Sequence, residues 1–393
     1  MKGKLHVNDA FITFYSFLIF NIGFTSIFPK IIVNLLTVFT FIITLLLFIS
    51  MFNAIHTRLN SVPFILFIIY ILLTILSAYL NRENGFYAGI VSSTINYIMI
   101  LTTLFLSIII IASFGKLKLF FVVIFYTGLA FCLINDIIFL PHYKAFISSQ
   151  AYLLHSKFQV AYSHLELLAL YLINIYSNSF KLKKSYLYIL IIFILSIDLS
   201  VDCITGITGL ILFVLFFGLR SKKLLKQPLF WLAIFTISAA VPFLYQNVVD
   251  SSIYQNFVLG SLNRGLTMNG RMNIYKAIPY LMYNHWQWGY GYGSSYAVVN
   301  GLISMPDMQN GFMELVVQVG LRAAITFVFF VFFVIRTIQY SSKINVFPLL
   351  IMIYVYTILG SFEITFSVTF FFICMIIYVL NENSSEVRRG IHF

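Results

Sequence analysis

The sequence predicts an all-α, polytopic integral membrane protein with about twelve transmembrane helices and one long outer loop that contains short helices. The composition supports this fold class, because 61% of the 393 residues are hydrophobic and only 9% are charged. Soluble domains carry about 25% charged residues. The mean hydropathy is +0.97. A soluble chain of this length could not bury so much apolar surface, so we expect a lipid bilayer to surround most of it.

Twelve apolar runs approach the roughly 20 residues that a helix needs to cross a bilayer. The seventh and eighth runs are short and nearly contiguous, which predicts a tight hairpin, and residues 88–94 could extend the fourth. The first run follows two lysines without a cleavage site of small residues, so we expect a retained helix. We see no internal repeat and treat residues 1–393 as one transmembrane domain. The predicted helices cover residues 11–28, 31–52, 62–80, 95–113, 117–135, 159–176, 185–200, 203–219, 228–246, 311–336, 346–361 and 364–381.

The distribution of basic residues predicts the orientation. With the N-terminus in the cytoplasm, 16 of the 24 Lys and Arg residues fall in cytoplasmic segments, and every such segment carries at least one. This positive-inside pattern predicts a bacterial inner-membrane protein with both termini in the cytoplasm. The basic excess is thereby explained without a nucleic-acid partner. The eight basic residues left outside or within the membrane are Lys30, Arg82, Lys144, Lys157, Arg264, Arg271, Lys276 and Arg322.

The long outer loop, residues 247–310, holds three of these basic residues. Long loops in compact proteins are usually functional. Arg271 opens a segment, residues 272–283, that can form a short helix, so a guanidinium and free backbone N–H groups are expected together. With Arg264 they form a candidate cradle for a diphosphate. The alternative is that these arginines pair with lipid head groups or with acidic residues of the same loop.

Residues 284–293 of this loop contain two Trp, two Tyr and three Gly. Flat aromatic faces beside polar groups suit sugar rings, and they also suit the membrane interface, where Trp and Tyr form belts. Both interpretations stay open. His285 is a candidate base, although a single His in a loop more often has no catalytic role.

A polar stripe opens the predicted helix 311–336. Four residues spaced by four positions share one drifting face: Asn310, Glu314, Gln318 and Arg322. Charged groups inside a membrane helix are costly and should face a polar cavity or one another. We favour a cavity lining, and a Glu314–Arg322 bridge is the alternative.

Other polar residues receive weaker interpretations. Lys157, His164 and Glu166 open the sixth helix, and Lys157 and His164 share a face. Asp198 and Asp202 flank the seventh-to-eighth hairpin, where small residues favour close helix packing. Glu363 sits at the last outer turn, where solvation explains it. No cofactor or metal motif is present, so neither is expected.

Four short motifs lie between residues 270 and 322: Gly270-Arg271, then Trp288-Gly289-Tyr290-Gly291-Tyr292-Gly293, Gln309-Asn310-Gly311-Phe312-Met313-Glu314-Leu315 and Val319-Gly320-Leu321. They resemble the C-terminal signature of the O-antigen polymerase and ligase family, which includes Wzy-type polymerases and lipid A–core ligases. Weaker matches lie at residues 156–162 and 203–209. The family commonly has His where this chain has Gln309. Because Gln cannot act as a general base, this difference disfavours a ligase.

The resemblance implies a metal-independent glycosyltransferase that polymerises lipid-linked repeat units of O-antigen, capsule or exopolysaccharide. The donor would be an oligosaccharide on a polyprenyl diphosphate, and the acceptor a sugar hydroxyl of the next repeat unit. In that interpretation Arg271 and Arg264 stabilise the leaving diphosphate. The residue that takes or orients the hydroxyl proton stays unassigned among Glu314, Asp307 and His285, with Glu314 as the first candidate. The expected substrate-binding residues are Lys157, Lys276, Trp286, Trp288, Tyr290, Tyr292, Gln309, Asn310 and Arg322.

Besides the lipid bilayer and the lipid-linked oligosaccharide, the resemblance implies a flippase and a chain-length regulator as candidate protein partners. Three alternatives stay open. They are a ligase, a transporter or flippase of lipid-linked sugars, and a non-catalytic assembly subunit. The absence of repeat-related halves disfavours a transporter.

Overall fold

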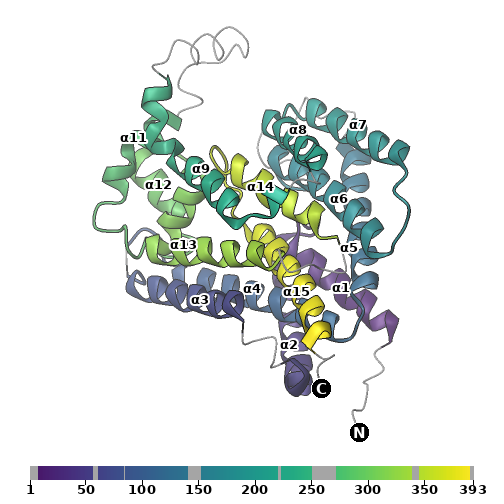
Figure 1. The fold of residues 1–393 in the computed structure, drawn as a ribbon. Helices are drawn as coiled ribbons and strands as arrows, with labels where there is room; N and C mark the ends of the chain where they lie inside the picture. Colours follow the sequence, from purple (N-terminus) through teal and green to yellow (C-terminus); the bar gives the residue numbers. More distant parts are fainter. Residues whose placement is uncertain are drawn as a thin grey trace.

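The computed structural model describes residues 8–55, 61–83, 85–139, 152–219, 223–249, 271–338 and 345–389. Within these ranges the regular elements are fourteen α-helices and one short 3-10 helix, and no β-strand occurs (Figure 1). The predicted all-α class is therefore confirmed for the part of the chain that the structure describes.

Each of the twelve predicted apolar runs coincides with a helix, with ends that differ by up to several residues. Helix α4 begins at Ile90, so most of residues 88–94 do extend the fourth run. Two short helices lie in the long loop, as predicted. The helices are α1 (Asp9–Gly23), α2 (Lys30–Ile55), α3 (Val62–Leu80), α4 (Ile90–Ser113), α5 (Leu117–Phe139), α6 (Lys157–Ser177), α7 (Lys184–Ser200), α8 (Ile204–Gly218), η3 (Lys223–Lys226), α9 (Pro228–Val249), α11 (Arg271–Leu281), α12 (Ser295–Ile303), α13 (Gly311–Thr337), α14 (Phe347–Leu359) and α15 (Val368–Arg389).

Five helices are long and apolar enough to cross a membrane: Lys30–Phe52, Val62–Leu80, Ile90–Ser113, Leu117–Phe139 and Gly311–Thr337. Five further apolar stretches of helix are 10–17 residues long, so twelve crossings stay a prediction. The surface supports a lipid surrounding. On α2, Ile31, Leu35 and Ile49 are 76%, 66% and 71% exposed. An apolar face of this extent is unusual in water and is compatible with a bilayer.

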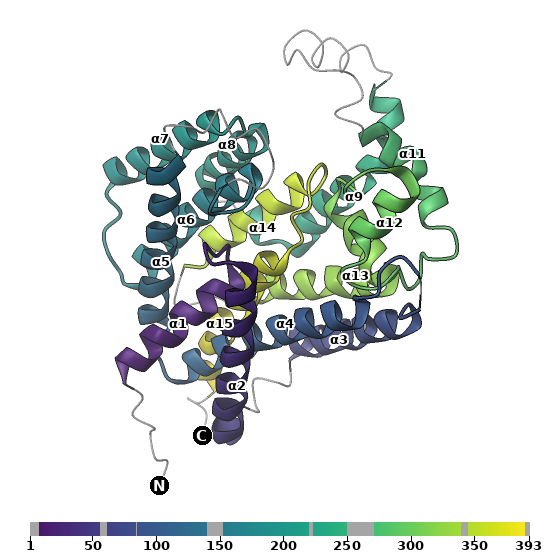
Figure 2. The same ribbon diagram turned by 180° about the vertical axis from the view of Figure 1, so that it is seen from behind.

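The helices pack as two groups about a central pair. Helices α3, α4 and α13 run side by side in one group, and α5 to α8 form the other (Figures 1 and 2). Helices α14 and α15 lie between the two groups, and nearly all of α14 is buried. Helix α11 contacts α9 and α12 at the far end of the first group. This arrangement brings the α14–α15 connection close to the start of α11.

Helix α13 is interrupted at Gly320, which has φ +80° and ψ 166°. Glycine adopts this conformation without a steric penalty, whereas other residues rarely do. The loop before α12 inserts at the break. The N–H of Leu321 donates to the Trp286 carbonyl (2.8 Å), and the N–H of Tyr290 donates to the Val317 carbonyl (2.8 Å). The loop thus satisfies backbone groups that the break leaves without helical partners, as a chain at membrane depth requires.

We call the contact between residues 286–290 and 317–321 the glycine lock. A Cβ atom at Gly320 would lie 2.3 Å from the carbonyl oxygen of Gln287, and one at Gly289 would lie 2.6 Å from the carbonyl oxygen of Val317. Both neighbours are backbone atoms, which cannot move aside. One glycine from each of two family-like motifs, Gly289 and Gly320, therefore has a structural explanation in the close approach of two backbone segments.

The lock also corrects the predicted polar stripe, because the break turns Arg322 away from it. The Arg322 guanidinium donates to Oε1 of Gln287 (2.6 Å) and lies 4.5 Å from the centre of the Trp288 ring. The alternative Glu314–Arg322 bridge is not formed either, since Glu314 accepts from Gln318 instead (2.7 Å).

Candidate functional site

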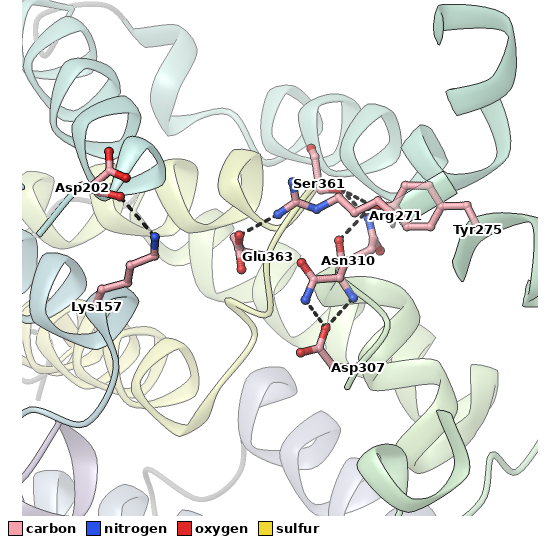
Figure 3. Close-up of polar contacts among 9 residues, drawn as sticks. Lys157, Asp202, Arg271, Tyr275, Asp307, Asn310, Ser361 and Glu363 are labelled. Atoms are coloured by element: carbon pink, nitrogen blue, oxygen red, sulfur yellow. Dashed lines mark hydrogen bonds and ion pairs between the residues drawn. The ribbon is translucent and has the colours of Figure 1, made fainter. Parts of the chain in front are cut away.

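A buried ion pair joins two distant parts of the sequence. Arg271 is the first residue of α11, and Glu363 lies in the α14–α15 connection. Nη2 of Arg271 donates to Oε1 of Glu363 at 2.8 Å, and the two side chains are only 13% and 10% exposed (Figure 3). The prediction that solvation accounts for Glu363 is therefore wrong. A carboxylate this deeply buried needs a cationic or hydrogen-bonding partner, and Arg271 provides one.

Neighbouring hydrogen bonds fix the position of this pair. One turn along α11, the hydroxyl of Tyr275 donates to the Gln309 carbonyl (2.8 Å), so α11 is tied to the segment before α13. Nδ2 of Asn310 donates to the Ser361 carbonyl (3.1 Å), so that segment is tied to the α14–α15 connection (Figure 3). The three chain segments together hold the carboxylate of Glu363 against Arg271.

The environment shifts the acidity of the carboxylate. Burial raises the pKa of Glu363 to about 7, although the adjacent Arg271 guanidinium opposes the increase. Asp307 also raises this pKa, and Lys157 lowers it. Burial raises the pKa of Tyr275 as well, so its hydroxyl stays a neutral donor. A carboxyl group with a pKa near neutrality is suited to accept and release a proton at physiological pH.

The guanidinium itself keeps a free donor. Nε of Arg271 is buried and has no hydrogen-bond acceptor among the residues that the structure describes. Leaving a buried donor without an acceptor costs about 1–3 kcal/mol, and more when the group is charged. Arg271 thus combines one hydrogen bond to Glu363 with an unused donor at the start of a helix, where the first backbone N–H groups lack intrahelical acceptors.

The other predicted binding residues in this region have varied surroundings. Lys157 donates to the Asp202 carbonyl (3.3 Å), and Lys276 is exposed. Nε2 of Gln309 donates to Asp307 (2.6 Å). Arg264 lies outside the described residues.

Asn310 caps the start of α13, and its predicted substrate contact stays a prediction. It is fully buried, and its Oδ1 accepts from the N–H of Met313 (3.0 Å) at the start of α13. Its Nδ2 donates hydrogen bonds to the carbonyls of Ser238 and Ser361. These bonds satisfy an N-terminal N–H of α13 and leave the amide no free donor for a sugar.

The aromatic segment serves packing at several positions. The Tyr290 ring is buried and stacks on His285 with ring centres 3.9 Å apart, and its hydroxyl donates to the Leu281 carbonyl. Trp286 and Trp288 are half-buried at the glycine lock. Because Tyr290 is enclosed by protein, it offers no open face to a sugar in this structure.

A cavity of about 490 Å³ lies between the α1–α2 turn, α4, α6, α13 and the α14–α15 connection. Glu314 and Gln318 line it, so the cavity expected beside the polar stripe is present for these two residues. Glu166 of α6 lines the same cavity and accepts from the Tyr356 hydroxyl (2.5 Å). Tyr292 of the aromatic segment also faces it. The polar lining distinguishes this space from the surrounding apolar bundle.

Two weaker predictions, one about α6 and one about the α7–α8 hairpin, have different outcomes. His164 does not act with Lys157, because Nε2 of His164 lies 2.9 Å from Asp136 of α5 inside the bundle. Close helix packing at the seventh-to-eighth hairpin is confirmed. A Cβ atom at Gly206 would lie 2.6 Å from the Cβ of Ala161.

The sequence pattern favours solvation for Glu363, gives Glu166 little weight and does not indicate Tyr275 at all. A signal for Glu363 is present in the sequence, since it is the sole acidic residue between Arg322 and Asn381. A single carboxylate among apolar helices needs a cation, and an outer-loop arginine is a natural partner. Tyr275 had no comparable signal, because its role depends on a carbonyl contributed by a distant segment.

Neither a scan of protein-family models nor searches of curated proteins and of solved structures find a match to this chain. Among the described residues no group of three His, Cys, Asp or Glu side chains is arranged to hold a metal ion. The Arg271–Glu363 pair and the adjoining polar cavity are the features on which we base a functional proposal.

Proposed function

We propose that the protein is a polymerase of lipid-linked oligosaccharide repeat units, a glycosyltransferase that uses a polyprenyl-diphosphate-linked donor. The observation that carries the proposal is the buried Arg271–Glu363 pair, with its unused guanidinium donor and a carboxyl group titrating near neutrality. In such a pair the guanidinium can stabilise a leaving anion, and the adjacent carboxylate can accept a proton. The resemblance of residues 270–322 to the polymerase and ligase family supports the same reaction.

In the proposed step, a hydroxyl oxygen of the acceptor sugar forms a bond to C1 of the donor sugar. The bond between C1 and the diphosphate oxygen breaks, and its electron pair stays on that oxygen. Arg271 stabilises the growing negative charge on the diphosphate more strongly in the transition state than in the ground state. Arg264 is retained as a second cation in this proposal.

The proton of the attacking hydroxyl passes to Glu363 and then to water. Glu363 replaces Glu314 as the proposed base for a geometric reason, because it directly contacts Arg271 (2.8 Å), where the leaving group would bind. Glu314 already accepts hydrogen bonds from Ser295 (2.8 Å) and Gln318 (2.7 Å) inside the cavity. We assign Glu314 to the binding of the acceptor.

The proposal includes the setting of the reaction. All twelve apolar helices would cross the bacterial inner membrane, with both termini in the cytoplasm and α11 and α12 on the outer face. The apolar bundle would hold the polyprenyl tail between helices, and the diphosphate would meet Arg271 at the bilayer surface. A flippase would supply the repeat units, and a chain-length regulator would act on the product.

Deletion of the gene in its host, followed by gel analysis of extracted surface polysaccharide, tests the proposal. The polymer ladder should collapse to a single repeat unit, and the wild-type gene should restore it. Arg271→Ala, expressed at the wild-type level, should not restore it. Arg82→Ala is the matched control, since Arg82 is exposed and pairs with the neighbouring Glu83.

The alternatives predict other ladders. Full-length polymer that stays on its lipid carrier would indicate a ligase. A complete ladder in the deletion strain, with no second polymerase gene present, would refute polymerisation and favour transport. A normal ladder from Arg271→Ala would refute the role assigned to the ion pair.

A further inference from the structure

The polar cavity contains two carboxylates that face it from different helices. Glu166 comes from α6 and Glu314 from α13, and both are at most 6% exposed. Their hydrogen-bond partners are neutral groups, which include the Tyr356 and Gln318 side chains and the backbone N–H of Met308. Within the described ranges, neither carboxylate has a Lys, Arg or His within salt-bridge distance. Buried carboxylates without a cation favour an occupant that brings hydrogen-bond donors.

A third group in the cavity wall has an unused hydrogen bond. Tyr162 of α6 lines the cavity and is 8% exposed, and its hydroxyl has no hydrogen-bond partner among the described residues. A buried hydroxyl without a partner costs about 1–3 kcal/mol, so it is a site where a ligand group gains a bond. Together with the two carboxylates, it gives the cavity acceptors and a donor on facing walls.

Aromatic surface and size complete the site. Tyr97 and Tyr292 line the cavity and stack on each other with ring centres 3.9 Å apart. The volume of about 490 Å³ lies within the roughly 300–1,000 Å³ of small-molecule sites. A few polar groups among aromatic walls, in a space of this size, suit a ligand with many hydroxyl groups and a partly apolar ring face.

The cavity adjoins the ion pair through the α14–α15 connection. Residues 364–369 of that connection and of the start of α15 line the cavity, and Glu363 immediately precedes them. Tyr162 lies near enough to Glu363 and Arg271 to interact electrostatically with both. A sugar bound in the cavity would therefore have a hydroxyl within reach of the proposed base.

We propose that this cavity binds a non-acidic sugar residue of the acceptor oligosaccharide, an inference that rests on the proposed polymerase function. Sugar hydroxyls or an amino-sugar ammonium would donate to Glu166 and Glu314, and Tyr162 would donate to a sugar oxygen. A uronic acid would bring a charged carboxylate close to Glu166 and Glu314, which offer it no cation, so the cavity selects against it. The basic side chains of the lining, Lys30 and His155, are exposed.

Protection of an engineered cysteine tests the binding directly. Thr25→Cys places a thiol in the half-buried cavity wall, and Gln159→Cys is a second reporter on α6 if the first variant folds poorly. The three native cysteines are buried, which keeps background labelling low. Full-length protein in lipid nanodiscs is labelled with a maleimide in the presence of repeat-unit oligosaccharide, released from the host's lipid-linked pool by mild acid. Asn300→Cys on the exposed surface of α12 is the control thiol.

The oligosaccharide should slow labelling of the cavity cysteine and leave the Asn300→Cys control unaffected. N-acetylglucosamine oligomers should protect better than glucuronic acid oligomers of equal length. Tyr162→Phe or Glu166→Gln in the reporter background should weaken protection about tenfold, the effect of one buried hydrogen bond. Tyr354→Phe also removes a buried tyrosine hydroxyl, one that donates to the Leu225 carbonyl away from the cavity, and should have no effect.

The outcomes separate this inference from the polymerase proposal. If the released repeat unit does not change the labelling rate of either reporter cysteine, the sugar site is overturned. This conclusion would hold even if the polymer ladder in the host depends on Arg271. Protection that is stronger with the acidic oligomers would overturn the selectivity. The oligosaccharide could also protect the cavity cysteine while the deletion strain keeps its full polymer ladder. That combination would support the sugar site and reject polymerisation.

Discussion

Arg271 lies where α11 begins and Arg322 lies just after the break in α13, and their surroundings differ in a way that separates a candidate chemical role from a role in folding. The Arg271 side chain is only 13% exposed, pairs with a carboxylate, and keeps Nε without a hydrogen-bond partner among the described residues. Arg322 is exposed beside the glycine lock and bonds to the neutral side chain of Gln287. A buried polar group with unused bonding capacity is a candidate for ligand binding, whereas a satisfied exposed group usually is not.

Both regions lie within the stretch that resembles the polymerase and ligase family, so the resemblance alone does not distinguish them. The geometry does. The glycines of the lock are required because two backbones approach within contact distance. Arg271 and Glu363 have no comparable packing requirement, since burying an ion pair is a poor way to gain stability. We therefore infer that the lock serves folding and keep the functional role of the ion pair as a proposal, and the following variants test this distinction.

The largest effect is expected from Gly320→Ala. A Cβ atom there would meet the backbone of Gln287 and Trp288 at 2.3 and 2.5 Å, and the positive φ adds strain. We expect a loss of more than about 4 kcal/mol of stability, seen as little or no folded protein in the membrane fraction. Gly218→Ala is the control, because nothing lies within 4 Å of its added Cβ. Normal abundance of Gly320→Ala would disprove the lock.

The next effect is expected from Glu363→Gln, which keeps an oxygen to accept from Arg271 but removes the proposed base. Transfer should slow by about 10²–10⁴-fold, the usual contribution of a general base, while the protein stays folded. The measurement is polymer formation from lipid-linked repeat units by purified protein. Glu83→Gln serves as the control, since its carboxylate is 82% exposed. A wild-type rate from Glu363→Gln would exclude Glu363 as the base.

A smaller and graded effect is expected from pH. Glu363 is protonated below its pKa of about 7 and ionised above it, and only the ionised form accepts a proton. The transfer rate should therefore fall as pH decreases below 7, by about tenfold per unit. Glu363→Gln should lose this dependence. A wild-type rate that stays flat from pH 8 to about 5 would contradict the assignment.

The same titration has the opposite sign for stability. The folded-state pKa of about 7 exceeds the ordinary value of 4.5. Between these values the folded protein binds more protons than the unfolded chain at this group. Its contribution to the free energy of unfolding is fully present below pH 4.5 and is lost as pH rises to about 7. Activity and this part of stability should thus change in opposite directions over one pH range.

The sequence was a good guide to the helices because their signal is local. Apolar runs and their polar boundaries depend on neighbouring residues, and all twelve predicted runs are helical. The break at Gly320 was not predicted, because it depends on a loop about thirty residues earlier in the sequence. Within the candidate site, Arg271 was recognised as an exception to the charge pattern. Glu363 was not, since its partner lies 92 residues away and only the packing of α11 against the α14–α15 connection brings them together.

The smallest effect is expected from Arg322→Ala, and it sharpens the comparison with Arg271 most directly. The lost contacts are one hydrogen bond to a neutral amide and an exposed interaction with the Trp288 ring, together worth about 0–1 kcal/mol. We expect a melting temperature near wild type and a polymer ladder reduced less than about threefold, whereas Arg271→Ala abolishes the ladder in the same strain. Arg322→Ala could instead abolish the ladder although the variant protein is present at normal abundance. In that case, the exposure of an arginine and its satisfied hydrogen bonds would not distinguish a structural role from a functional one in this protein. The continuous polar stripe predicted from the spacing of four would then describe the substrate-bound state better than the broken helix does.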